Sequence, residues 1–209
     1  MKKLPGKTVE RLSEYRRTLL GYHDEGNNYI YSHELAGLLH ITAVQVRRDL
    51  MLIGYTSVLK KGYDVKELIK TIGHIIDSEE GQNVAVVGIG NLGRAITSYF
   101  KGKRSKLNIV ASFDNDAQKV NRVISGVKCY HMDEMEEVVK ANRISIAILT
   151  VPPTHARGVA EEVIKHGIKG ILNFTTVSLN MPQNVHLEEY DMITSLEKVA
   201  YFVKESEHL

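Results

Sequence analysis

The sequence predicts an α/β protein with a mainly helical N-terminal domain and a C-terminal domain built on a doubly wound parallel sheet. Apolar residues recur at helical spacing through most of residues 8–76, and a polar segment follows at residues 77–81. Beyond it, short apolar runs alternate with helical stretches, as in parallel sheets that helices cover on both faces. We expect domains at residues 1–80 and 81–190, with a C-terminal helix in residues 191–209.

Composition excludes several classes of protein. The chain is 43% hydrophobic, yet no run approaches the roughly 18 apolar residues of a membrane-spanning helix. The opening MKKLPGKTVERL lacks the apolar core of a signal peptide, so we expect a soluble, cytoplasmic protein. Cys129 is the single cysteine and can form neither an internal disulfide nor a thiolate metal cage, and we expect no metal site.

The charge is divided unevenly along the chain. Residues 1–76 contain twelve Lys and Arg against eight Asp and Glu, whereas residues 77–209 contain fifteen against seventeen. The N-terminal part is therefore positive and the remainder slightly negative. This distribution favours a polyanionic partner for the N-terminal part.

The first helix begins near Thr8 and ends at the polar segment 24–28. Two short helices follow, at residues 32–40 and 42–54. Ser32 and Thr42 are suitable N-cap residues for them, and Gly54 ends the second. In that second helix one face is apolar, and the polar residues are spread over the other faces: Gln45, Arg47, Arg48 and Asp49.

Two short strands are expected between Tyr55 and Val65, around the basic turn Lys60-Lys61-Gly62, before a connecting helix at residues 66–76. The two short helices with this turn resemble a winged helix-turn-helix, whose second helix enters the major groove of DNA. Gln45 can contact an adenine edge, and Arg47 or Arg48 can contact a guanine or a phosphate. Lys60 and Lys61 would lie on the wing. The alternative is an ordinary solvated helix face.

Beyond residue 81 the sequence predicts buried strands at residues 83–88, 107–113, 144–151 and 170–174. Helices are expected at residues 91–100 and 155–166, and a further amphipathic helix at residues 195–204. This order of elements predicts a parallel sheet that helices cover on both faces.

The segment VAVVGIGNLGRA places Gly88, Gly90 and Gly93 in the spacing G-x-G-x-x-G, directly after a strand and at the start of a helix. The first glycine permits the tight turn, the second lets the backbone approach a pyrophosphate, and the third lets the helix pack close to the strand. The free N–H groups at the start of the helix would receive the phosphates. The residues between the glycines belong to the same site: Ile89, Asn91 and Leu92.

Asp114 ends the next strand, 21 positions after Gly93, where a carboxylate accepts hydrogen bonds from the ribose hydroxyls and repels a 2′-phosphate. The expected ligand is therefore NAD(H). The segment ILTVPPTHA ends a further strand with Thr150, Val151 and Pro152, where ligands lie in doubly wound sheets. The alternatives are a glycine-rich turn with a surface aspartate, and a proline pair that only ends the strand.

The chain resembles the Rex family of redox-sensing transcriptional repressors. The similar segments occur in the same order along nearly the whole chain: SHELAGLLHITAVQVRRDL, GYDVKELI, GIGNLGRA, FDND, TVPPTHARGVAEEVIKHGIKGILNF and DMITSLEKVAYF. The resemblance implies a homodimer with a winged helix, a Rossmann domain and a C-terminal helix swapped to the partner subunit. It also implies binding to an inverted-repeat operator with NAD⁺ and release when NADH accumulates.

The resemblance extends to a switch. It implies that Tyr99 lies beside the nicotinamide, that Met192 lies near the same pocket, and that Arg17 and Asp191 form an ion pair in one state only. The wing departs from the family pattern, which has Gly-Lys-Arg-Gly-Val-Gly-Tyr where this chain has SVLKKGY at residues 57–63. The basic pair is displaced, and the flanking glycines are missing.

Two other interpretations remain. An NAD-dependent oxidoreductase needs a proton-transfer group near the nicotinamide, and His155 is the best placed of nine histidines, although none lies in a recognisable catalytic motif. A CoA- or acyl-adenylate-binding Rossmann domain would leave Asp114 without a special task. We expect no catalytic residue.

Overall fold

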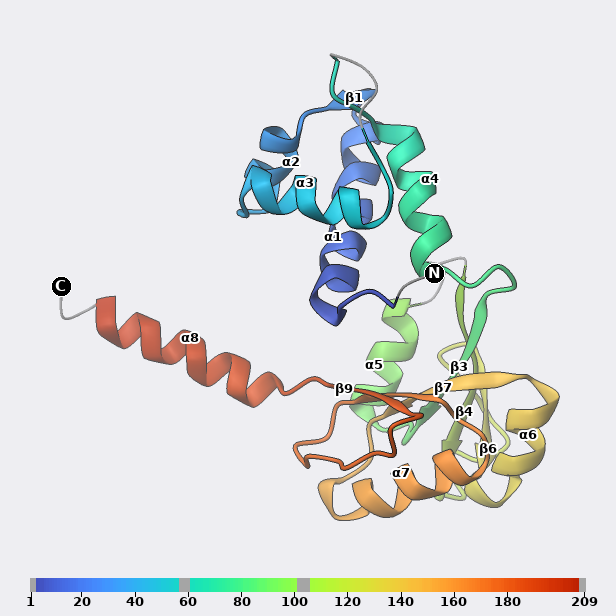
Figure 1. Ribbon diagram of the computed structural model, residues 1–209. Helices are drawn as coiled ribbons and strands as arrows, with labels where there is room; N and C mark the ends of the chain where they lie inside the picture. The colour runs from blue at the N-terminus through green and yellow to red at the C-terminus, as the bar shows by residue number, and fades with distance from the viewer. Residues whose placement is uncertain (1–2, 57–60, 101–105, 207–209) are drawn as a thin grey trace. The chain divides into compact units, whose positions relative to one another are not determined.

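The computed structural model describes residues 3–56, 61–100 and 106–206 (Figure 1). The chain divides into two compact units, Met1–Glu79 and Glu80–Leu209. Among the described residues, no helix combines the length and apolar character needed to cross a membrane.

The N-terminal unit packs four helices around one apolar core and adds a two-stranded sheet. Its elements are α1 (Gly6–Asp24), β1 (Tyr29–Ile30), α2 (Ser32–Leu38), α3 (Ala43–Leu52), β2 (Tyr63–Asp64) and α4 (Val65–Ile76). The fully buried side chains of Leu12, Leu35, Leu50 and Leu68 come one from each helix, so all four helices share the core. The helix-turn-helix expected at residues 32–54 is thus α2 and α3.

The helix ends agree with the sequence in part. The Thr42 hydroxyl accepts a hydrogen bond from the Gln45 N–H at 3.2 Å, and Gly54 adopts a φ of +72° just after α3, as predicted. The assignment of Ser32 as the N-cap of α2 is wrong. Tyr31 precedes the helix, and its N–H donates to the Glu34 carboxylate at 2.7 Å. The Glu34 carboxylate therefore satisfies the Tyr31 N–H at the start of α2.

The predicted hairpin stays a prediction, because most of its first strand lies outside the described residues. Strand β2 pairs antiparallel with β1, with Ile30 opposite Tyr63. Strand β1 is two residues long, too short to give a periodic signal. Residues 57–60, which include most of the other expected strand and Lys60, lie outside the described residues.

The C-terminal unit contains a seven-stranded sheet in the order β5-β6-β4-β3-β7-β8-β9. All neighbours are parallel except the edge pair β5 and β6. The strands are β3 (Gln82–Val87), β4 (Leu107–Asp114), β5 (Val123–Ile124), β6 (Val127–His131), β7 (Ile144–Leu149), β8 (Gly170–Asn173) and β9 (His186–Glu189). The chain order reverses between β3 and β7, which makes this crevice the expected ligand site of a doubly wound sheet.

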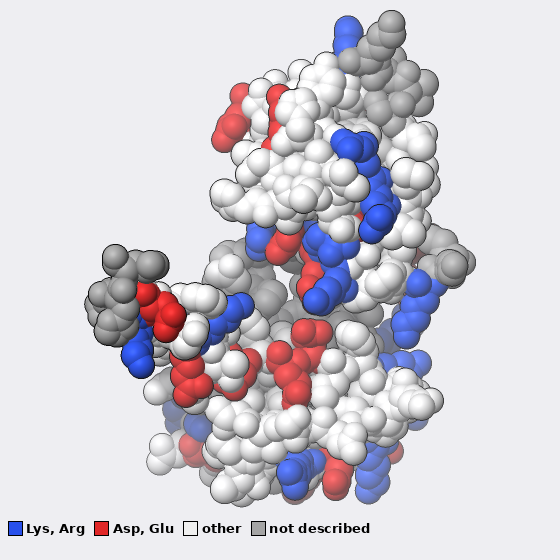
Figure 2. Space-filling view, turned by 60° about the vertical axis from the view of Figure 1, so that its left-hand side comes forward, with Lys and Arg blue, Asp and Glu red and all other residues white. Residues whose placement is uncertain are grey.

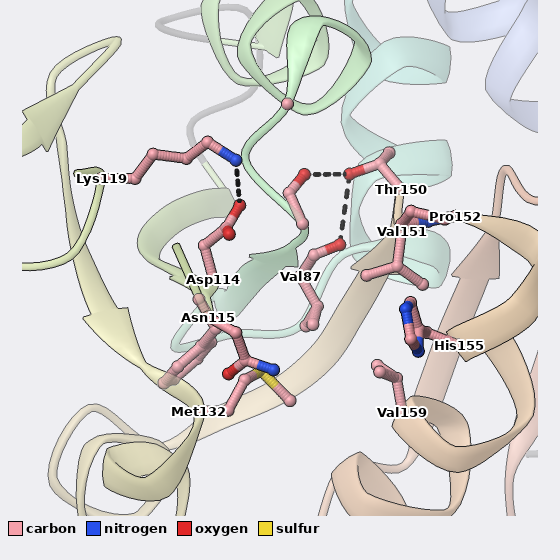
Figure 3. Close-up of a pocket in the computed structure, with 13 residues that line it drawn as sticks. Val87, Asp114, Asn115, Lys119, Met132, Thr150, Val151, Pro152, His155 and Val159 are labelled. Carbon is pink, nitrogen blue, oxygen red and sulfur yellow. Dashed lines mark hydrogen bonds and ion pairs between the residues drawn. The ribbon is translucent and has the colours of Figure 1, made fainter. Parts of the chain in front are cut away.

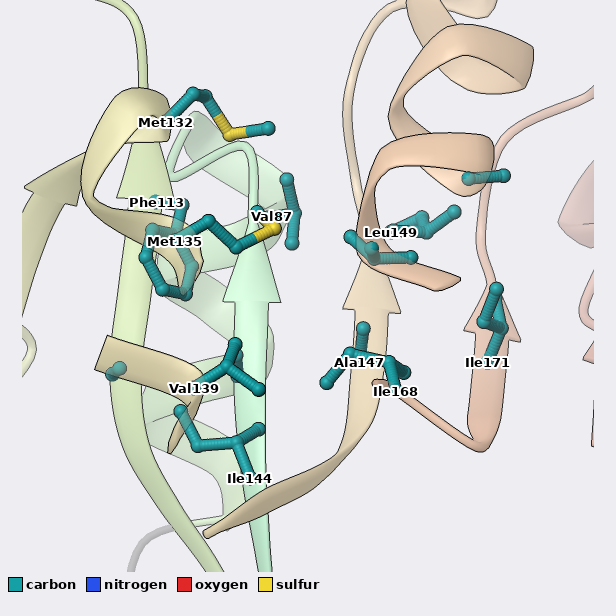
Figure 4. Packing of buried hydrophobic residues seen from close by; sticks show 14 of the residues in the cluster. Val87, Phe113, Met132, Met135, Val139, Ile144, Ala147, Leu149, Ile168 and Ile171 are labelled. Carbon is teal, nitrogen blue, oxygen red and sulfur yellow. The ribbon is translucent and has the colours of Figure 1, made fainter. Parts of the chain in front are cut away.

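Helices cover both faces of this sheet. Along β3, Ala85 and Val87 point into one apolar cluster and Val84 and Val86 into another, as the two-residue period of a strand requires. Figure 4 shows part of the first cluster, which α6 and α7 cover. The helices of this unit are α5 (Asn91–Phe100), α6 (Met135–Ala141), α7 (Ala156–Lys165) and α8 (Met192–Ser206). The first three contribute to the two clusters, whereas the described residues of α8 are exposed. The prediction of a parallel sheet between helices is confirmed.

Candidate nucleotide site and nucleic-acid interface

The turn between β3 and α5 explains why three glycines occupy it. Gly88 has a φ of +92°, and a Cβ there would lie 2.8 Å from the Cγ1 atom of Val151. A Cβ on Gly93 would collide with the Gly88 carbonyl oxygen. A Cβ on Gly90 would meet no atom within 4 Å. The fold itself therefore requires Gly88 and Gly93, whereas Gly90 only keeps the space in front of α5 open.

Thr150 fixes this turn from the end of β7. Its hydroxyl lies 2.6 Å from the Gly88 carbonyl oxygen and 3.2 Å from that of Val87 (Figure 3). Since both contacts are to carbonyl oxygens, the hydroxyl donates to them and is occupied. The side chain ties β7 to the β3 turn across the crevice.

Asp114 is held by three donors at the end of β4. Its Oδ2 atom accepts from the Ile89 N–H and from Lys119 Nζ, each at 3.0 Å, and its Oδ1 atom accepts from the Asp116 N–H at 3.0 Å. Burial alone would lower the pKa of Lys119, but the hydrogen bonds and negative charges of Asp114 and Asp116 together outweigh it, and the pKa is raised. Lys119 therefore stays a cation beside the carboxylate.

These residues border a cavity of about 570 Å³, a size typical of ligand sites. Figure 3 shows Asp114, Asn115 and Met132 on one side and Thr150, Val151 and His155 on the other. The lining residues are Val87, Gly88, Gly90, Phe113, Asp114, Asn115, Lys119, Met132, Thr150, Val151, Pro152, His155 and Val159.

The cavity brings together six of the residues predicted to bind the cofactor: Gly88, Gly90, Asp114, Thr150, Val151 and Pro152. Five others do not line it: Ile89, Asn91, Leu92, Gly93 and Tyr99. Ile89 is fully buried and Tyr99 is 62% exposed. Sequence reasoning missed Asn115, Lys119 and Met132. Their common signal is position, because each follows the carboxyl end of β4 or β6.

Helix α3 exposes both of its arginines. Arg47 Nη1 donates to the Ser32 hydroxyl at 3.0 Å, which links α3 to the start of α2, and Arg48 is exposed. Lys61 is exposed as well. Figure 2 shows Lys and Arg side chains grouped on the face of the N-terminal unit that it presents.

The expectation that Asp49 lies away from the buried face is wrong, because its side chain is completely buried. Arg11 donates from Nε to Oδ2 at 2.6 Å and from Nη2 to Oδ1 at 2.8 Å. The Tyr15 hydroxyl donates to Oδ2 at 2.7 Å, and Gln45 Nε2 donates to Oδ1 at 3.0 Å. These donors compensate the buried charge, so a carboxylate is stable in the core.

The pKa values in this network follow from the same contacts. Burial alone would raise the pKa of Asp49, but the hydrogen bonds from Arg11 and Tyr15 outweigh it and leave the pKa lowered. Burial, with the hydrogen bond to Asp49, raises the pKa of Tyr15. At neutral pH the network therefore consists of an anion, a cation and a neutral phenol.

The predicted switch residues lie in different units. Arg17 is exposed on α1. Asp191 caps α8, accepting from the Ile193 N–H at 2.8 Å and from the Thr194 hydroxyl at 2.7 Å. Met192 is 50% exposed, and every described residue of α8 is exposed. An ion pair between Arg17 and Asp191 would join the two units and stays a prediction.

Two family models match the chain. Residues 79–177 match the CoA binding domain, and residues 3–50 match the putative DNA-binding protein N-terminus. Among curated proteins, the redox-sensing transcriptional repressor Rex of Exiguobacterium sp. (strain AT1b) is 37% identical and covers 97% of this chain and 93% of its own length. Rex of Lactobacillus acidophilus is 36% identical, with 96% and 95% covered.

Among solved structures, this chain is also similar to a Rex-family protein. The complex of RSP, a Rex-family repressor, with β-NAD⁺ and operator DNA has a TM-score of 0.90 at 30% identity, and it covers 99% of this chain and 95% of RSP. The complex of RSP with β-NADH has a TM-score of 0.86 at the same identity, with 99% and 97% covered. Both similarities extend over the two units.

Proposed function

The chain belongs to the Rex family of redox-sensing transcriptional repressors, and from this premise we propose that NADH controls its binding to operator DNA. The observation that carries the proposal is the pairing, in one chain, of an exposed basic helix α3 with a cavity between the Gly90 turn and Asp114. One unit has the elements for contacting DNA and the other those for sensing a dinucleotide. The protein is a repressor that leaves its operator when NADH binds.

The cavity suits NAD(H) residue by residue. Gly90 leaves room for a pyrophosphate, and the N–H groups at the start of α5 attract its charge. The Asp114 carboxylate would accept hydrogen bonds from the adenosine ribose. Thr150, Val151 and Pro152 lie at the carboxyl end of β7, on the other side of the crevice. NAD⁺ and NADH differ there by a hydride and a positive charge, so only groups that contact the nicotinamide can distinguish them.

The family model for residues 79–177 carries the name of CoA, but the site favours NAD(H). The Asp114 carboxylate, which is fixed at the end of β4, suits the ribose hydroxyls and repels the 2′-phosphate of NADP(H). The related repressor RSP was crystallised with β-NAD⁺ and with β-NADH. Both points favour the dinucleotide.

The redox signal enters through this nucleotide and not through a thiol. Cys129, the single cysteine of the chain, is fully buried on β6. Burial raises the pKa of its thiol, and the reactive form of cysteine is the thiolate. A protonated, inaccessible thiol is a poor redox sensor.

We propose a sensor without catalytic turnover. His155 lines the cavity, and this favours the alternative of an NAD-dependent oxidoreductase. Incubation of the protein with NADH and candidate carbonyl oxidants separates the two: stoichiometric binding without NADH consumption supports the sensor. Steady consumption that disappears in His155→Ala would support the enzyme.

The dimer is part of the proposal. Helix α8 exposes a set of large apolar side chains: Met192, Ile193, Leu196, Val199, Tyr201, Phe202 and Val203. Exchange of α8 with a partner subunit would cover them, as the family resemblance implies. Two copies of α3 would then bind the two half-sites of an inverted repeat. A cytoplasmic location follows, because a repressor must reach the DNA that it regulates.

The switch extends from the nicotinamide to the DNA-binding unit. In the proposed NADH-bound state Tyr99 lies beside the nicotinamide ring and Met192 lies near the same pocket. Arg17 and Asp191 form their ion pair in one of the two states. A charge pair that is costly to break can hold one orientation of the units.

The proposed DNA binding is tested in two steps. A DNA sequence is selected from a pool of random inverted repeats, and its affinity for the protein is then measured by titration. The parent should bind it specifically. The variants Arg47→Ala and Arg48→Ala should each lose about 1–3 kcal/mol of affinity, since each removes a base or phosphate contact. A double variant that binds as the parent does would remove α3 from the interface.

A further inference from the structure

We propose that Asp49 orients the side-chain amide of Gln45 so that it offers one acceptor and one donor to an adenine in the major groove. Asp49 is then a positioning residue for sequence recognition. The inference rests on the proposed DNA binding by α3 and names the base that Gln45 contacts.

The carboxylate decides which way the amide faces. Gln45 Nε2 lies 3.0 Å from Asp49 Oδ1. An ionised carboxylate only accepts hydrogen bonds, so the amide nitrogen must face it and Oε1 must point elsewhere. The reversed amide would place two oxygen acceptors against each other.

One N–H and one oxygen of Gln45 remain for a ligand. An amide nitrogen carries two N–H groups, and Asp49 takes one of them. The second N–H and Oε1 form a donor and acceptor pair. Adenine is the base that presents the matching pair in the major groove, with an acceptor at N7 and a donor at N6.

Asp49 is held in place and cannot move with the Gln45 side chain. Asp49 is completely buried, and Arg11 and Tyr15 hold both of its oxygens from helix α1. Gln45 is one turn earlier on α3, so its side chain and that of Asp49 lie on the same side of the helix. A free glutamine loses side-chain freedom on binding, whereas this one is already restricted before DNA arrives.

The network also explains an otherwise costly feature. A carboxylate in a small apolar core loses its hydration, and an apolar residue there would pack with Val46 and Leu50 without that cost. Arg11 and Tyr15 supply three of the four hydrogen bonds that compensate the charge. The fourth contact, to the half-buried Gln45, connects the core to the surface that we assign to DNA.

The test uses the full-length protein and the operator selected above. Each base pair of a half-site is replaced in turn, and affinity is measured for the parent and for Gln45→Ala, Asp49→Asn and Tyr15→Phe. The parent should prefer adenine at one position by about tenfold or more, and 7-deazaadenine there should remove the preference. Gln45→Ala should lose it as well.

Asp49→Asn should reduce this preference to threefold or less without changing the preferences at other positions or the affinity for non-specific DNA. Asp49→Asn should add nothing in a Gln45→Ala background. Thermal unfolding identifies a variant that does not fold. In that case Tyr15→Phe, which keeps the Arg11 contacts and removes one hydrogen bond from Asp49, carries the test with a smaller reduction at the same position.

The outcomes separate the two proposals. A parent protein that selects no DNA overturns both the proposed function and this inference. A parent that selects an operator, but whose adenine preference is absent or is unchanged in Asp49→Asn and Tyr15→Phe, overturns the inference alone.

Discussion

Replacing Gly90 by valine should abolish NADH binding without weakening the fold. A Cβ at this position meets no atom within 4 Å, so the first atom of the new side chain lies in open space. It occupies the space where the pyrophosphate must approach the backbone. We expect a change in the free energy of unfolding within about 1 kcal/mol, because fewer backbone conformations remain open to the unfolded chain.

The magnitude of the NADH effect can be worked out for a thermal unfolding assay. At a ligand concentration of 100 Kd, NADH should stabilise the parent by about 2.7 kcal/mol, which is about 5–10 °C in Tm for a chain of this size. Gly90→Val should show no shift with NADH. Gly158→Val is the matched control, because its Cβ also meets nothing within 4 Å and Gly158 does not line the cavity.

A second substitution in the same turn should have the opposite pattern. The Cβ of Gly93→Ala would collide with the Gly88 carbonyl oxygen, which already accepts from Thr150. Helix α5 must shift away from β3, at a cost of about 1–3 kcal/mol. The reasoning is refuted if Gly90→Val keeps the full NADH shift, or if Gly93→Ala is as stable as the parent.

Three further predictions concern the other contacts. Asp114→Ala should weaken NADH binding and raise NADPH affinity relative to it, because Lys119 loses the closer of its two carboxylate partners and becomes more available to a 2′-phosphate. Calorimetry on Asp114→Ala and on the double variant with Lys119→Ala checks this, and equal NADPH binding by the two would contradict it. The pKa of Asp49 is lowered in the fold, so its contribution to the free energy of unfolding is complete above the ordinary pKa of 3.8 and is lost as the pH falls below that value. In Asp49→Asn the free energy of unfolding of the N-terminal unit should therefore depend less on pH in that range, and a pH dependence like that of the parent would refute this. Arg17→Ala and Asp191→Ala should each reduce the effect of NADH on operator affinity while NADH affinity stays within a few-fold, and strictly additive effects in a double-mutant cycle would show that they do not pair.

Local sequence predicts the β3–α5 segment well because its determinants are local. The bounds of α5 agree with the expected residues 91–100, and the turn before it is fixed by glycines whose roles depend on nearby backbone. In the C-terminal unit, the sequence does not predict strands β5, β6 and β9 or helix α6. They are two, five, four and seven residues long, so periodicity has little length in which to show.

Contacts between distant residues account for the other differences. An aspartate is expected at the surface, but Asp49 can be buried because Arg11, 38 residues earlier in the chain, donates a hydrogen bond to it. Strand β2 pairs with a strand more than thirty residues upstream. Lys119 reaches Asp114 only because the segment after β4 turns back on itself. A single sequence carries no direct signal of these pairings.

The central claim is that NADH, and not NAD⁺, releases this protein from its operator. It is tested most directly by a mobility-shift titration on an inverted-repeat operator, with either nucleotide added at equal concentration to the full-length protein. We predict that binding persists with NAD⁺ and is lost as NADH is added, and that Gly90→Val stays bound in both. Operator binding that NADH leaves unchanged, or that NAD⁺ and NADH abolish equally, would contradict the account.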